Sequence, residues 1–341
     1  MPQISIVIPN LNGAHYLETC LPSLARQELK PAEILVVDNA SADNSLEVVR
    51  KLAPEATVLA QLKNLGFAAA ANAGARAATG AWIAILNNDT EAAPDWLAQC
   101  ASAIERHPDA SFLACRVLDF AARDRLYSAG DCFLRAGIGF RRGQGLPDRE
   151  EYRREVEIFS ACGCAAVYRK DLFEKAGGYD EDFFAYLEDI DLALRLRARG
   201  YRGYYAAGAR VFHHGGGTSG GEFSPLSVRL RTRNSLLLLI KCFPARFLWR
   251  CSPMIVALQL SWLARAVAHR RLLSYVRGLA GIIPRLPAAL FRRRRLMTQM
   301  RASADKVWRA IIRSENMARQ DFSPPADPPK SAFLRWYFRA F

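Results

Sequence analysis

Apolar and polar positions alternate along the first hundred residues in a repeating pattern of strand, loop and helix. Four short apolar runs, bounded by turn residues, have the length and β-branched content of buried strands. Each run is followed by a polar turn and a helical segment, as at Leu17, Leu21 and Leu24. This alternation predicts an α/β fold with a doubly wound, mostly parallel sheet. The four runs cover residues 4–8, 33–37, 57–60 and 83–87.

Polar residues stand where three of these strands end. Asp38 follows the second strand, Asn64 follows the third, and the triplet 87–89 (Asn-Asn-Asp) follows the fourth. Right-handed crossovers place the carboxyl ends of parallel strands at one edge, where open α/β sheets bind ligands. We therefore expect Asp38, Asn64 and Asp89 to line one crevice. Asp89 can hold a divalent cation against a diphosphate, although the triplet alone could equally be a turn that caps the next helix.

A second group of acidic candidates opens a helix that is predicted from residue 188 onward. Glu188, Asp189 and Asp191 lie in its first turn, where carboxylates complement the positive end of the helix dipole. Neighbouring aromatic residues can also desolvate these carboxylates, as is typical of a general base. The region before this helix contains a further predicted strand, over residues 160–168.

Histidine and asparagine residues supply further candidates. A predicted strand ends at His213-His214, directly before the glycine run 215–217, which would allow close approach of the backbone to a ligand. A lone histidine is nevertheless more often structural than a ligand. In the alanine-rich helix predicted over 68–78, Asn72 and Arg76 share one face, and Arg76 could contact a diphosphate or form a structural ion pair.

The positive charge of the chain is concentrated in its last third. The 341 residues carry a net charge of +14, but residues 1–225 hold 24 Lys and Arg against 29 Asp and Glu, whereas residues 226–341 hold 23 against 4. We predict a globular domain over 1–225, basic amphipathic helices over 226–322, and a Pro-rich linker with an aromatic, basic tail over 323–341. Residues 119–158 interrupt the strand pattern and are predicted to form a flexible flap or an acceptor-side loop.

Basic helices with Trp, Phe and Leu on one side suit an anionic membrane surface. The alternative is a helical subdomain that packs on the core, and nucleic-acid binding is not expected because no recognition module is present. The sequence contains no uninterrupted run of eighteen apolar residues, so a membrane-spanning helix is not predicted. The N-terminus does not resemble a signal peptide. We expect a cytoplasmic protein, peripheral at the inner face of the cytoplasmic membrane, whose eight scattered cysteines are reduced thiols.

Six segments, in this order, resemble the inverting family 2 glycosyltransferases of the GT-A fold, in particular the rhamnosyltransferase-like branch. The resemblance covers about residues 3–235. Neither a phosphate-binding GxxxxGKS loop nor a dinucleotide-binding GxGxxG segment after the first strand is present, so a P-loop kinase and a dinucleotide enzyme are not expected. The segments are SIVIPNLNG, VVDNASADNS, NLGFAAAAN, LNNDTE, GGYDEDFFAYLEDIDLALRLRARGYR and VFHHGG.

The resemblance implies a metal site and a nucleotide-sugar site. Asp89 would bind Mg²⁺ or Mn²⁺, and His213 would complete the metal site, with His214 as the rival. The donor would be a dTDP- or UDP-sugar, with Asp38 at the pyrimidine edge. Arg233 would touch either the diphosphate or the seam between domains. Together with the spacing, the resemblance gives these donor-binding candidates: Pro9, Asn12, Asp38, Asn64, Asn72, Arg76, Asn88 and Arg233.

The resemblance also implies the reaction. Asp189 would act as general base on a hydroxyl of a cell-surface glycan or lipid-linked acceptor, with Glu188 beside it and Asp191 as a supporting acid. A single base without a protein nucleophile would invert the anomeric centre, while the metal ion neutralises charge on the leaving diphosphate. Two alternatives are a non-catalytic scaffolding protein on the same fold and a nucleotidyltransferase. The latter would need a glycine-rich, basic loop that residues 9–13 lack.

Overall fold

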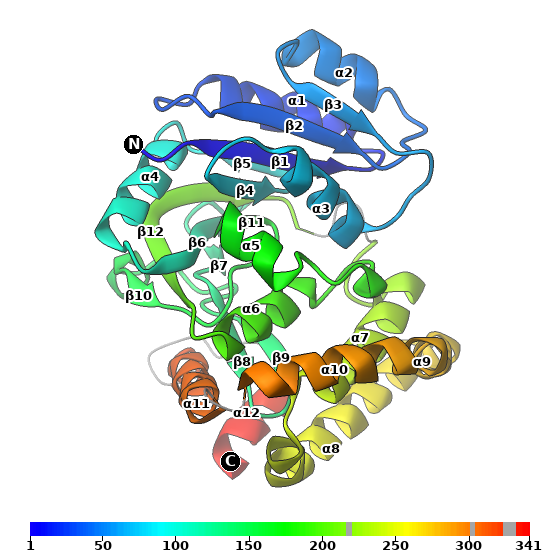
Figure 1. Cartoon of the computed structure of the whole chain (residues 1–341). Coiled ribbons are helices and arrows are strands. Elements are labelled where there is room, and N and C mark those ends of the chain that lie inside the picture. The colour runs from blue at the N-terminus through cyan, green and yellow to red at the C-terminus, as the bar shows by residue number, and fades with distance from the viewer. Residues whose placement is uncertain (216–219, 301–303, 323–331) are drawn as a thin grey trace.

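Within residues 1–215, 220–300, 304–322 and 332–341, which the computed structural model describes, a twisted sheet of ten strands lies between helices on both faces (Figure 1). A further pair of strands, β8 and β9, forms a separate small sheet. The strands are β1 (Ile4–Asn10), β2 (Glu33–Asp38), β3 (Thr57–Ala60), β4 (Trp82–Leu86), β5 (Thr90–Ala92), β6 (Ala110–Asp119), β7 (Leu126–Ser128), β8 (Asp131–Leu134), β9 (Ile138–Arg141), β10 (Val156–Glu157), β11 (Ala165–Arg169) and β12 (Arg202–His213).

Helices α1 to α6 belong to the part of the chain that builds the sheet, and α7 to α12 follow it. Three short 3-10 helices, η1 (Glu150–Arg153), η2 (Glu181–Phe183) and η3 (Ile283–Arg285), lie between them. The α-helices are α1 (Ala14–Ala25), α2 (Ser45–Leu52), α3 (Phe67–Ala77), α4 (Trp96–Arg106), α5 (Lys170–Ala176), α6 (Glu188–Ala198), α7 (Pro225–Cys242), α8 (Ala245–Ala268), α9 (Leu272–Ala280), α10 (Leu286–Met300), α11 (Ala304–Gln320) and α12 (Ala332–Ala340).

The order of the strands places one parallel half of the sheet beside a mixed half. The main path runs β10-β12-β6-β11-β4-β1-β2-β3, with β5 paired to β12 and β7 to β6. Strands β3, β2, β1 and β4 are parallel, whereas β11 is antiparallel to both β4 and β6. The mostly parallel, doubly wound sheet predicted from the sequence is therefore confirmed, and its strand ends meet at one edge.

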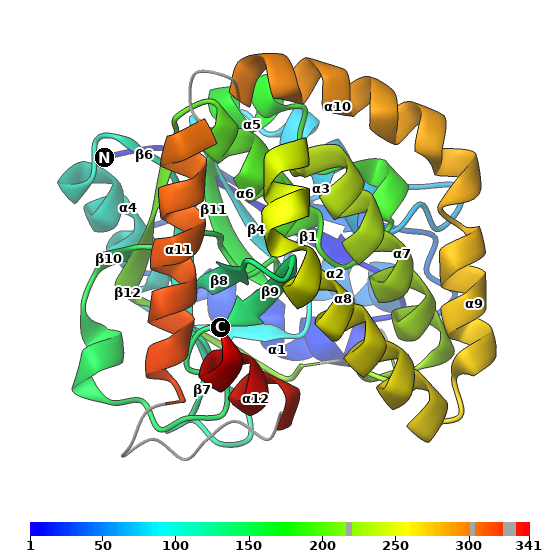
Figure 2. The same cartoon turned by 90° about the horizontal axis from the view of Figure 1, so that it is seen from below.

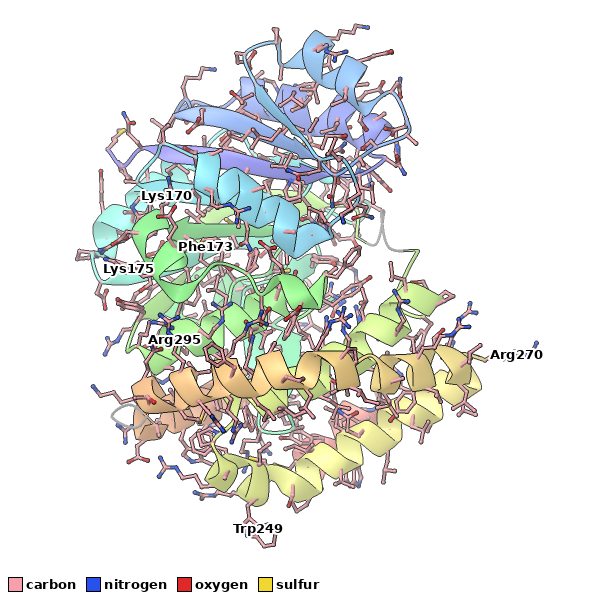
Figure 3. The ribbon with its side chains drawn as sticks, turned by 45° about the vertical axis from the view of Figure 1, so that its right-hand side comes forward. Lys170, Phe173, Lys175, Trp249, Arg270 and Arg295 are labelled. Carbon is pink, nitrogen blue, oxygen red and sulfur yellow. The ribbon has the colours of Figure 1, made fainter. Side chains whose placement is uncertain are left out.

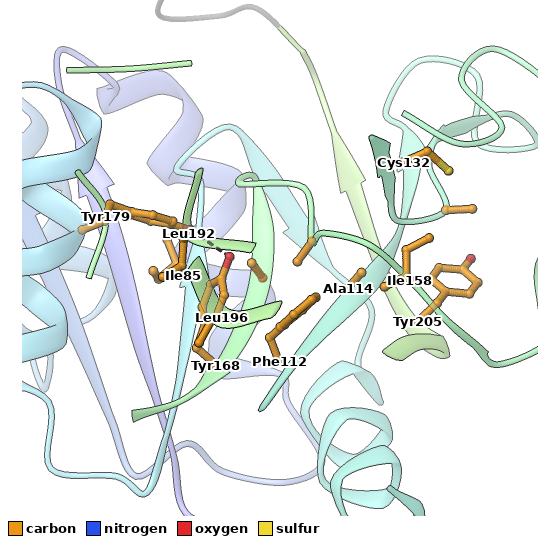
Figure 4. Packing of buried hydrophobic residues seen from close by; sticks show 14 of the residues in the cluster. Ile85, Phe112, Ala114, Cys132, Ile158, Tyr168, Tyr179, Leu192, Leu196 and Tyr205 are labelled. Carbon is orange, nitrogen blue, oxygen red and sulfur yellow. Dashed lines mark hydrogen bonds between the residues drawn. The ribbon is translucent and has the colours of Figure 1, made fainter. Parts of the chain in front are cut away.

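Alternate residues of each central strand face the two hydrophobic layers. In β1, Val7 packs in the layer with α3, α5 and α6, and Ile6 packs in the layer with α1, α2 and α4. This period of two is expected for a strand buried on both faces. In the first layer, Tyr168 contacts Phe112 at a ring-centroid distance of 6.1 Å and accepts a hydrogen bond from Tyr179 (Figure 4). These layers fix the strand ends that carry the polar residues.

The predicted strands match the observed ones closely, with one instructive exception. The weak strand over residues 57–60 has the predicted bounds, but β11 begins five residues later than the predicted start at 160. The residues before Ala165 leave the sheet because they have other partners. The N–H of Gly163 donates to a carboxylate oxygen of Asp189 at 3.1 Å. The first residues of the predicted strand therefore bend toward Asp189, a candidate catalytic residue.

Residues 119–158 are ordered, which corrects the prediction of a flexible flap. The segment contains β7, β8, β9, η1 and β10. In β8, the ring of Phe133 contacts Phe243 edge-on, and the backbone N–H of Phe133 donates to the hydroxyl of Ser314 at 2.7 Å. The segment is held by apolar and polar contacts with helices that lie far away in the sequence.

The helices after residue 225 form a layer below the sheet. Seen from below, α8 lies in front, with α9 and α10 along one edge and α11 on the opposite side (Figure 2). The predicted boundary after residue 225 falls at the first residue of α7. Apolar residues of α7, α8, α10 and α11 share a hydrophobic cluster with α6 and β8. Residues 323–331 of the predicted linker lie outside the described residues.

Helix α8 is the one described helix that is long and apolar enough to cross a membrane, judged by length and composition alone. Its 24 residues include charged ones, which is why a search for uninterrupted apolar runs does not find it. Its inner face packs on the protein, since Trp262 donates to the hydroxyl of Thr232 at 2.8 Å. All eight cysteines are buried free thiols.

Candidate functional site

Hydrogen bonds connect the ends of three strands at one edge of the sheet. The side-chain amide of Asn10, at the end of β1, donates to Asp38 at 3.1 Å, and the side-chain amide of Asn88 donates to Oδ1 of Asn10 at 2.7 Å. A Cβ on Gly13 would lie 2.0 Å from the Asn88 amide nitrogen, so a larger residue there would displace the Asn88 side chain from its bond with Asn10. The predicted convergence of Asp38 with the 87–89 triplet is thus present as a bonded network, in which Asn10 is a member that the sequence analysis missed.

The remaining residues of this edge order the loops around it. Asn12 adopts a left-handed conformation with φ of 49°, and its side-chain oxygen accepts from the N–H of Ala42 at 2.7 Å. The exposed Asn64 accepts from the amide of Asn39 at 3.0 Å. Pro9 is buried within β1. The loops after β1, β2 and β3 are therefore held together at the edge where Asp38 lies.

Asp89 and His213 face one another beside this network. The Nε2 atom of His213 lies 3.0 Å from the Asp89 carboxylate, and both side chains are buried. Burial alone would raise the pKa of Asp89, but the hydrogen bond and charge of His213 outweigh it and lower this pKa. The Asn87 side chain completes the group, with its amide nitrogen 3.5 Å from the same imidazole nitrogen.

The residues present fit a divalent cation that is completed by other ligands. Among the described residues no group of three His, Cys, Asp or Glu side chains could hold a metal alone. The 3.0 Å between the Asp89 and His213 ligand atoms is, however, about the separation of neighbouring ligands around an octahedral Mg²⁺ ion. The side-chain oxygen of Asn87 has no hydrogen-bond partner within the described residues. Asp89 and His213 could thus hold an ion whose other ligands are diphosphate oxygens and water.

Asp189 is tied to the same edge through two consecutive residues. Its carboxylate accepts from the N–H of Gly163 at 3.1 Å and from that of Ile190 at 2.7 Å. The adjacent Cys164 carbonyl accepts from the N–H of Asn87 at 2.9 Å. The segment 163–164 therefore connects the candidate base with the triplet that carries Asp89.

The two neighbouring carboxyl groups are perturbed in the direction that acid–base chemistry needs. Burial raises the pKa of Asp189, although the N–H groups of Ile190 and Gly163 and the charge of Arg141 act against it. Burial and the charge of Asp189 raise the pKa of Glu188 to about 8. One oxygen of Glu188 has no hydrogen-bond partner among the described residues. Buried carboxyl groups of this kind cluster at functional sites.

The loop that leads to Asp189 is strained and is held by α7. Phe184, Tyr186 and Leu187 all have positive φ values, between 66° and 71°. Such non-glycine conformations persist only where surrounding contacts impose them. The amide of Asn234 donates to the carbonyls of residues 183, 185 and 186 at 2.8 to 3.0 Å, and Arg233 donates to the carbonyls of residues 182 and 183 at 2.8 Å. Arg233 was predicted to touch either the diphosphate or the seam between domains, and these contacts correspond to the seam.

Three other predicted site residues lie in contacts away from the strand-end network. Asn72 donates to the Tyr179 carbonyl at 2.9 Å, and the exposed Arg76 lies 3.6 Å from Glu181. Asp191 is fully buried, and Arg195 donates to it at 2.8 Å. Asn72 and Arg76 hold the loop before α6, and the carboxylate of Asp191 is paired with basic side chains.

The structure adds aromatic and basic residues that the sequence analysis did not single out. Tyr127 contacts the His213 ring edge-on at a centroid distance of 4.4 Å, and the Arg141 guanidinium lies 4.5 Å from the centre of the Tyr127 ring. Arg231, two residues before Arg233, lies 4.9 Å from the centre of the Tyr186 ring. The charged 141–145 segment and the basic start of α7 were visible in the sequence, but their contacts with Tyr127 and Tyr186 were not. Gly216 and Gly217 of the predicted glycine run lie outside the described residues.

The strand order, the metal-type pair after β4 and the carboxylate at the start of α6 define the GT-A class of α/β fold. Residues 5–177 match the family model described as "Glycosyl transferase family 2", which covers half of the chain. The protein belongs to glycosyl transferase family 2, and the fold class and family expected from the sequence are confirmed.

Curated relatives are similar to part of this chain. The O-antigen biosynthesis protein RfbC of Myxococcus xanthus is 29% identical over 226 residues, which are 62% of this chain and 17% of RfbC. The N-acetylglucosaminyl-diphospho-decaprenol L-rhamnosyltransferase of Mycobacterium tuberculosis is 26% identical over 234 residues, 62% of this chain and 76% of that protein. The chain thus spans only about a sixth of the first relative's length.

Solved structures show the same fold. GalNAc-T7, crystallised with UDP, GalNAc and Mn²⁺, superposes with a TM-score of 0.57 at 17% identity, over 71% of this chain and 48% of that one. The mannosyltransferase PcManGT from Pyrobaculum calidifontis, in complex with GDP-Man and Mn²⁺, superposes with a TM-score of 0.51 at 18% identity, over 94% and 86%. At these identities the likeness concerns the fold.

Proposed function

We propose that the protein is an inverting glycosyltransferase that moves a sugar from a nucleoside diphosphate to a hydroxyl of a cell-surface glycan or lipid-linked acceptor. The observation that carries this proposal is the pair of bonds through residues 163–164. They hold the half-buried carboxylate of Asp189 in one group with the Asp89–His213 pair. A base beside a diphosphate-type site is what direct displacement at an anomeric carbon requires.

The proposed step uses the residues of this group in distinct roles. The acceptor oxygen forms its bond to the anomeric carbon as the bond between that carbon and the diphosphate oxygen breaks. Asp189 receives the hydroxyl proton, and the electron pair of the broken bond leaves with the diphosphate. Asp89 and His213 would hold Mg²⁺ or Mn²⁺, which supplies charge neutralisation for the leaving group when bound. Displacement from the opposite face inverts the anomeric centre.

The donor would lie along the strand-end network. Asp38 is placed at the end of β2 with its carboxylate fixed by Asn10 and by the N–H of Ser41 at 3.1 Å, so it can accept from a pyrimidine edge. We propose a dTDP- or UDP-sugar, and rhamnose as the sugar by analogy with the mycobacterial relative. That relative's name includes a diphosphate-linked lipid, which supports a lipid-linked acceptor here.

We also propose that transfer takes place at the inner face of the cytoplasmic membrane. Residues 226–300 contain 15 Lys and Arg and no Asp or Glu. Helices α8 to α10 expose large apolar side chains among these charges, including Trp249 (84% exposed), Ile283 (73%) and Phe291 (72%). Trp249 points away from the body of the molecule at its lower end (Figure 3). Basic charge with exposed aromatic and aliphatic groups is the chemistry of an anionic lipid surface.

The test of the proposed reaction is the Asp189→Asn variant. It keeps the shape of the side chain and removes the base, so transfer should fall by at least about 10²-fold, the lower range for general-base catalysis. Binding of UDP or dTDP, measured by calorimetry with and without Mn²⁺, should remain within about twofold of the wild type. Exposed Glu47→Gln on α2 serves as the matched control. Retained transfer in Asp189→Asn would show that the base has been misassigned.

The same experiment addresses the alternative of a scaffolding protein on this fold. Folded wild-type protein that binds neither UDP nor dTDP, and transfers no sugar to glycan or lipid-linked acceptors, would favour that alternative.

A further inference from the structure

Two arginines near the candidate site, Arg141 and Arg231, have no role in the proposed reaction. Arg141 ends β9 with a half-buried side chain, and its guanidinium lies against the ring of Tyr127. Asp131 is its direct partner across the β8–β9 ladder, but the Asp131 carboxylate accepts a hydrogen bond from Ser128 at 2.8 Å. The charge of Asp131 acts on Arg141, but the two form no ion pair within 4 Å in the part of the chain that the structure describes. A partly buried cation costs free energy unless an anion accompanies it.

Arg231 approaches the same place from α7. Its guanidinium lies over the ring of Tyr186, two residues before Glu188. Its nearest carboxylate is that of Glu222, at 3.7 Å, and the same oxygen lies 3.2 Å from Arg265. Burial and the like charge of Arg141 lower the pKa of Arg231. The two guanidinium groups are therefore near enough to repel each other. The closest carboxylate contact that either one makes within the described residues is the 3.7 Å between Arg231 and Glu222.

Their ring contacts locate both arginines relative to the reaction centre. The Tyr127 ring, against which the Arg141 guanidinium lies, contacts the imidazole of His213 edge-on. Arg141 also acts on the carboxylate of Asp189, whose pKa it lowers against the effect of burial. Arg141 thus contacts a ring that packs on His213, and its charge reaches Asp189. Arg231 lies beside the strained loop that leads to Asp189.

We propose that Arg141 and Arg231 together bind a diphosphate ester beside the Asp89–His213 pair. The proposal rests on the proposed function and adds two ligand-binding residues to it. Guanidinium groups bind phosphate oxygens through paired hydrogen bonds, and a diphosphate offers two negative groups to two like charges that otherwise repel. The diphosphate can come from the nucleotide donor or from a lipid diphosphate acceptor, and the chemistry of recognition is the same.

The test compares Arg141→Gln, Arg231→Gln and the double variant with a matched control, Arg229→Gln. Arg229 lies on α7 in an exposed position. Calorimetry would measure binding of UDP and dTDP, with Mn²⁺ present, and of farnesyl diphosphate as a soluble lipid diphosphate. We expect each single variant to lose about tenfold to a hundredfold in affinity for one of the two ligand classes, and Arg229→Gln to lose less than about twofold. Thermal unfolding would verify that each variant is folded.

The outcome assigns the source of the diphosphate. Weaker nucleotide binding with unchanged farnesyl diphosphate binding identifies the donor, and the reverse pattern identifies the acceptor. Arg→Lys variants should recover part of the affinity, because they keep the charge and lose the planar pair of donors. Affinities that match the control for both classes, or a wild-type protein that binds neither class, would overturn the proposal. Transfer activity that survives such a result would leave the proposed function standing without the arginine site.

Discussion

The ammonium group of Lys241 lies 2.5 Å from a carboxylate oxygen of Asp191, and both side chains are buried. Lys241 belongs to α7 and Asp191 to α6, so the pair joins the C-terminal helices to the helix that starts with the candidate base. Burial alone would raise the pKa of Asp191, but Lys241 and Arg195 outweigh it and lower this pKa. The acid that the sequence suggested as a catalytic partner of Asp189 is thus the anchor of its helix.

Removing the lysine should therefore destabilise the fold. Lys241→Met leaves Asp191 and Asp180 without a shared cation, and we expect the free energy of unfolding to fall by about 3–5 kcal/mol in urea titrations. Arg246→Met is the control, because its ion pair with Asp305 is exposed and should contribute less than about 1 kcal/mol. Equal losses in the two variants would contradict the role of the buried pair.

The two consecutive histidines should differ in metal dependence. His213 faces Asp89, whereas the exposed His214 stacks on Phe120 at a centroid distance of 3.6 Å. We expect His213→Ala to abolish the gain in nucleotide affinity that Mn²⁺ confers, and His214→Ala to retain most of it. Calorimetry with Mn²⁺ and with EDTA provides the measurement. If His214→Ala lost more of this gain than His213→Ala, His214 rather than His213 would be the second metal ligand.

Stability should decline as the pH rises through the range set by the buried carboxyl groups. Glu188 has a folded-state pKa of about 8, raised by burial and by Asp189, and burial with the charge of Asp189 raises that of Asp131 to about 7. A carboxyl group whose pKa is raised on folding stabilises the protein fully below its unfolded pKa, and this contribution is lost as the pH rises.

We therefore expect the unfolding free energy to decrease between about pH 5 and about pH 8, a window set by these raised values. Glu188→Gln should make the unfolding free energy depend less on pH, so that the variant becomes more stable relative to the wild type as the pH rises. Thermal melts at several pH values in this window would measure it. A variant whose stability runs parallel to the wild type would show that Glu188 titrates elsewhere.

Membrane binding should depend on the exposed face of α8 to α10. Trp249→Ser combined with Phe291→Ser should reduce binding to phosphatidylglycerol vesicles by about tenfold or more, because two large apolar groups would no longer enter the lipid. Leu62→Ser, at a fully exposed position after β3, is the matched control. Flotation of the protein with vesicles gives the bound fraction. Binding that is insensitive to the double variant, or equal on neutral vesicles, would refute this surface.

The sequence predicted the meeting of the strand ends well because its determinants are local. Strands at residues 33–37 and 57–60 are short β-branched runs, and chain connectivity alone sends Asp38 and Asn64 to one edge. The contacts of Asn10 with Asp38 and Asn88 then follow from strand adjacency. The assignment of a role to each of these residues remains a prediction.

What the sequence could not supply depends on contacts between distant residues. Residues 119–158 are held by pairs such as Arg135 with Glu315, whose side chains lie 2.6 Å apart although the residues are 180 positions apart in the chain. No periodicity within residues 119–158 reveals such a partner. For the same reason Arg231 and Arg233 could not be told apart, because their directions depend on how α7 packs against the loop before α6.

The place of β12 bears on how activities could be exchanged between members of the family. This strand, with α6 before it, lies beyond residue 177, where the family match ends. A chimera that grafts only the matched segment into another scaffold would carry Asp89 but neither Asp189 nor His213, and its sheet would lack the neighbour of β6. The unit that recombination must move intact therefore extends at least through His213, and the Lys241 anchor on α7 extends it to residue 242.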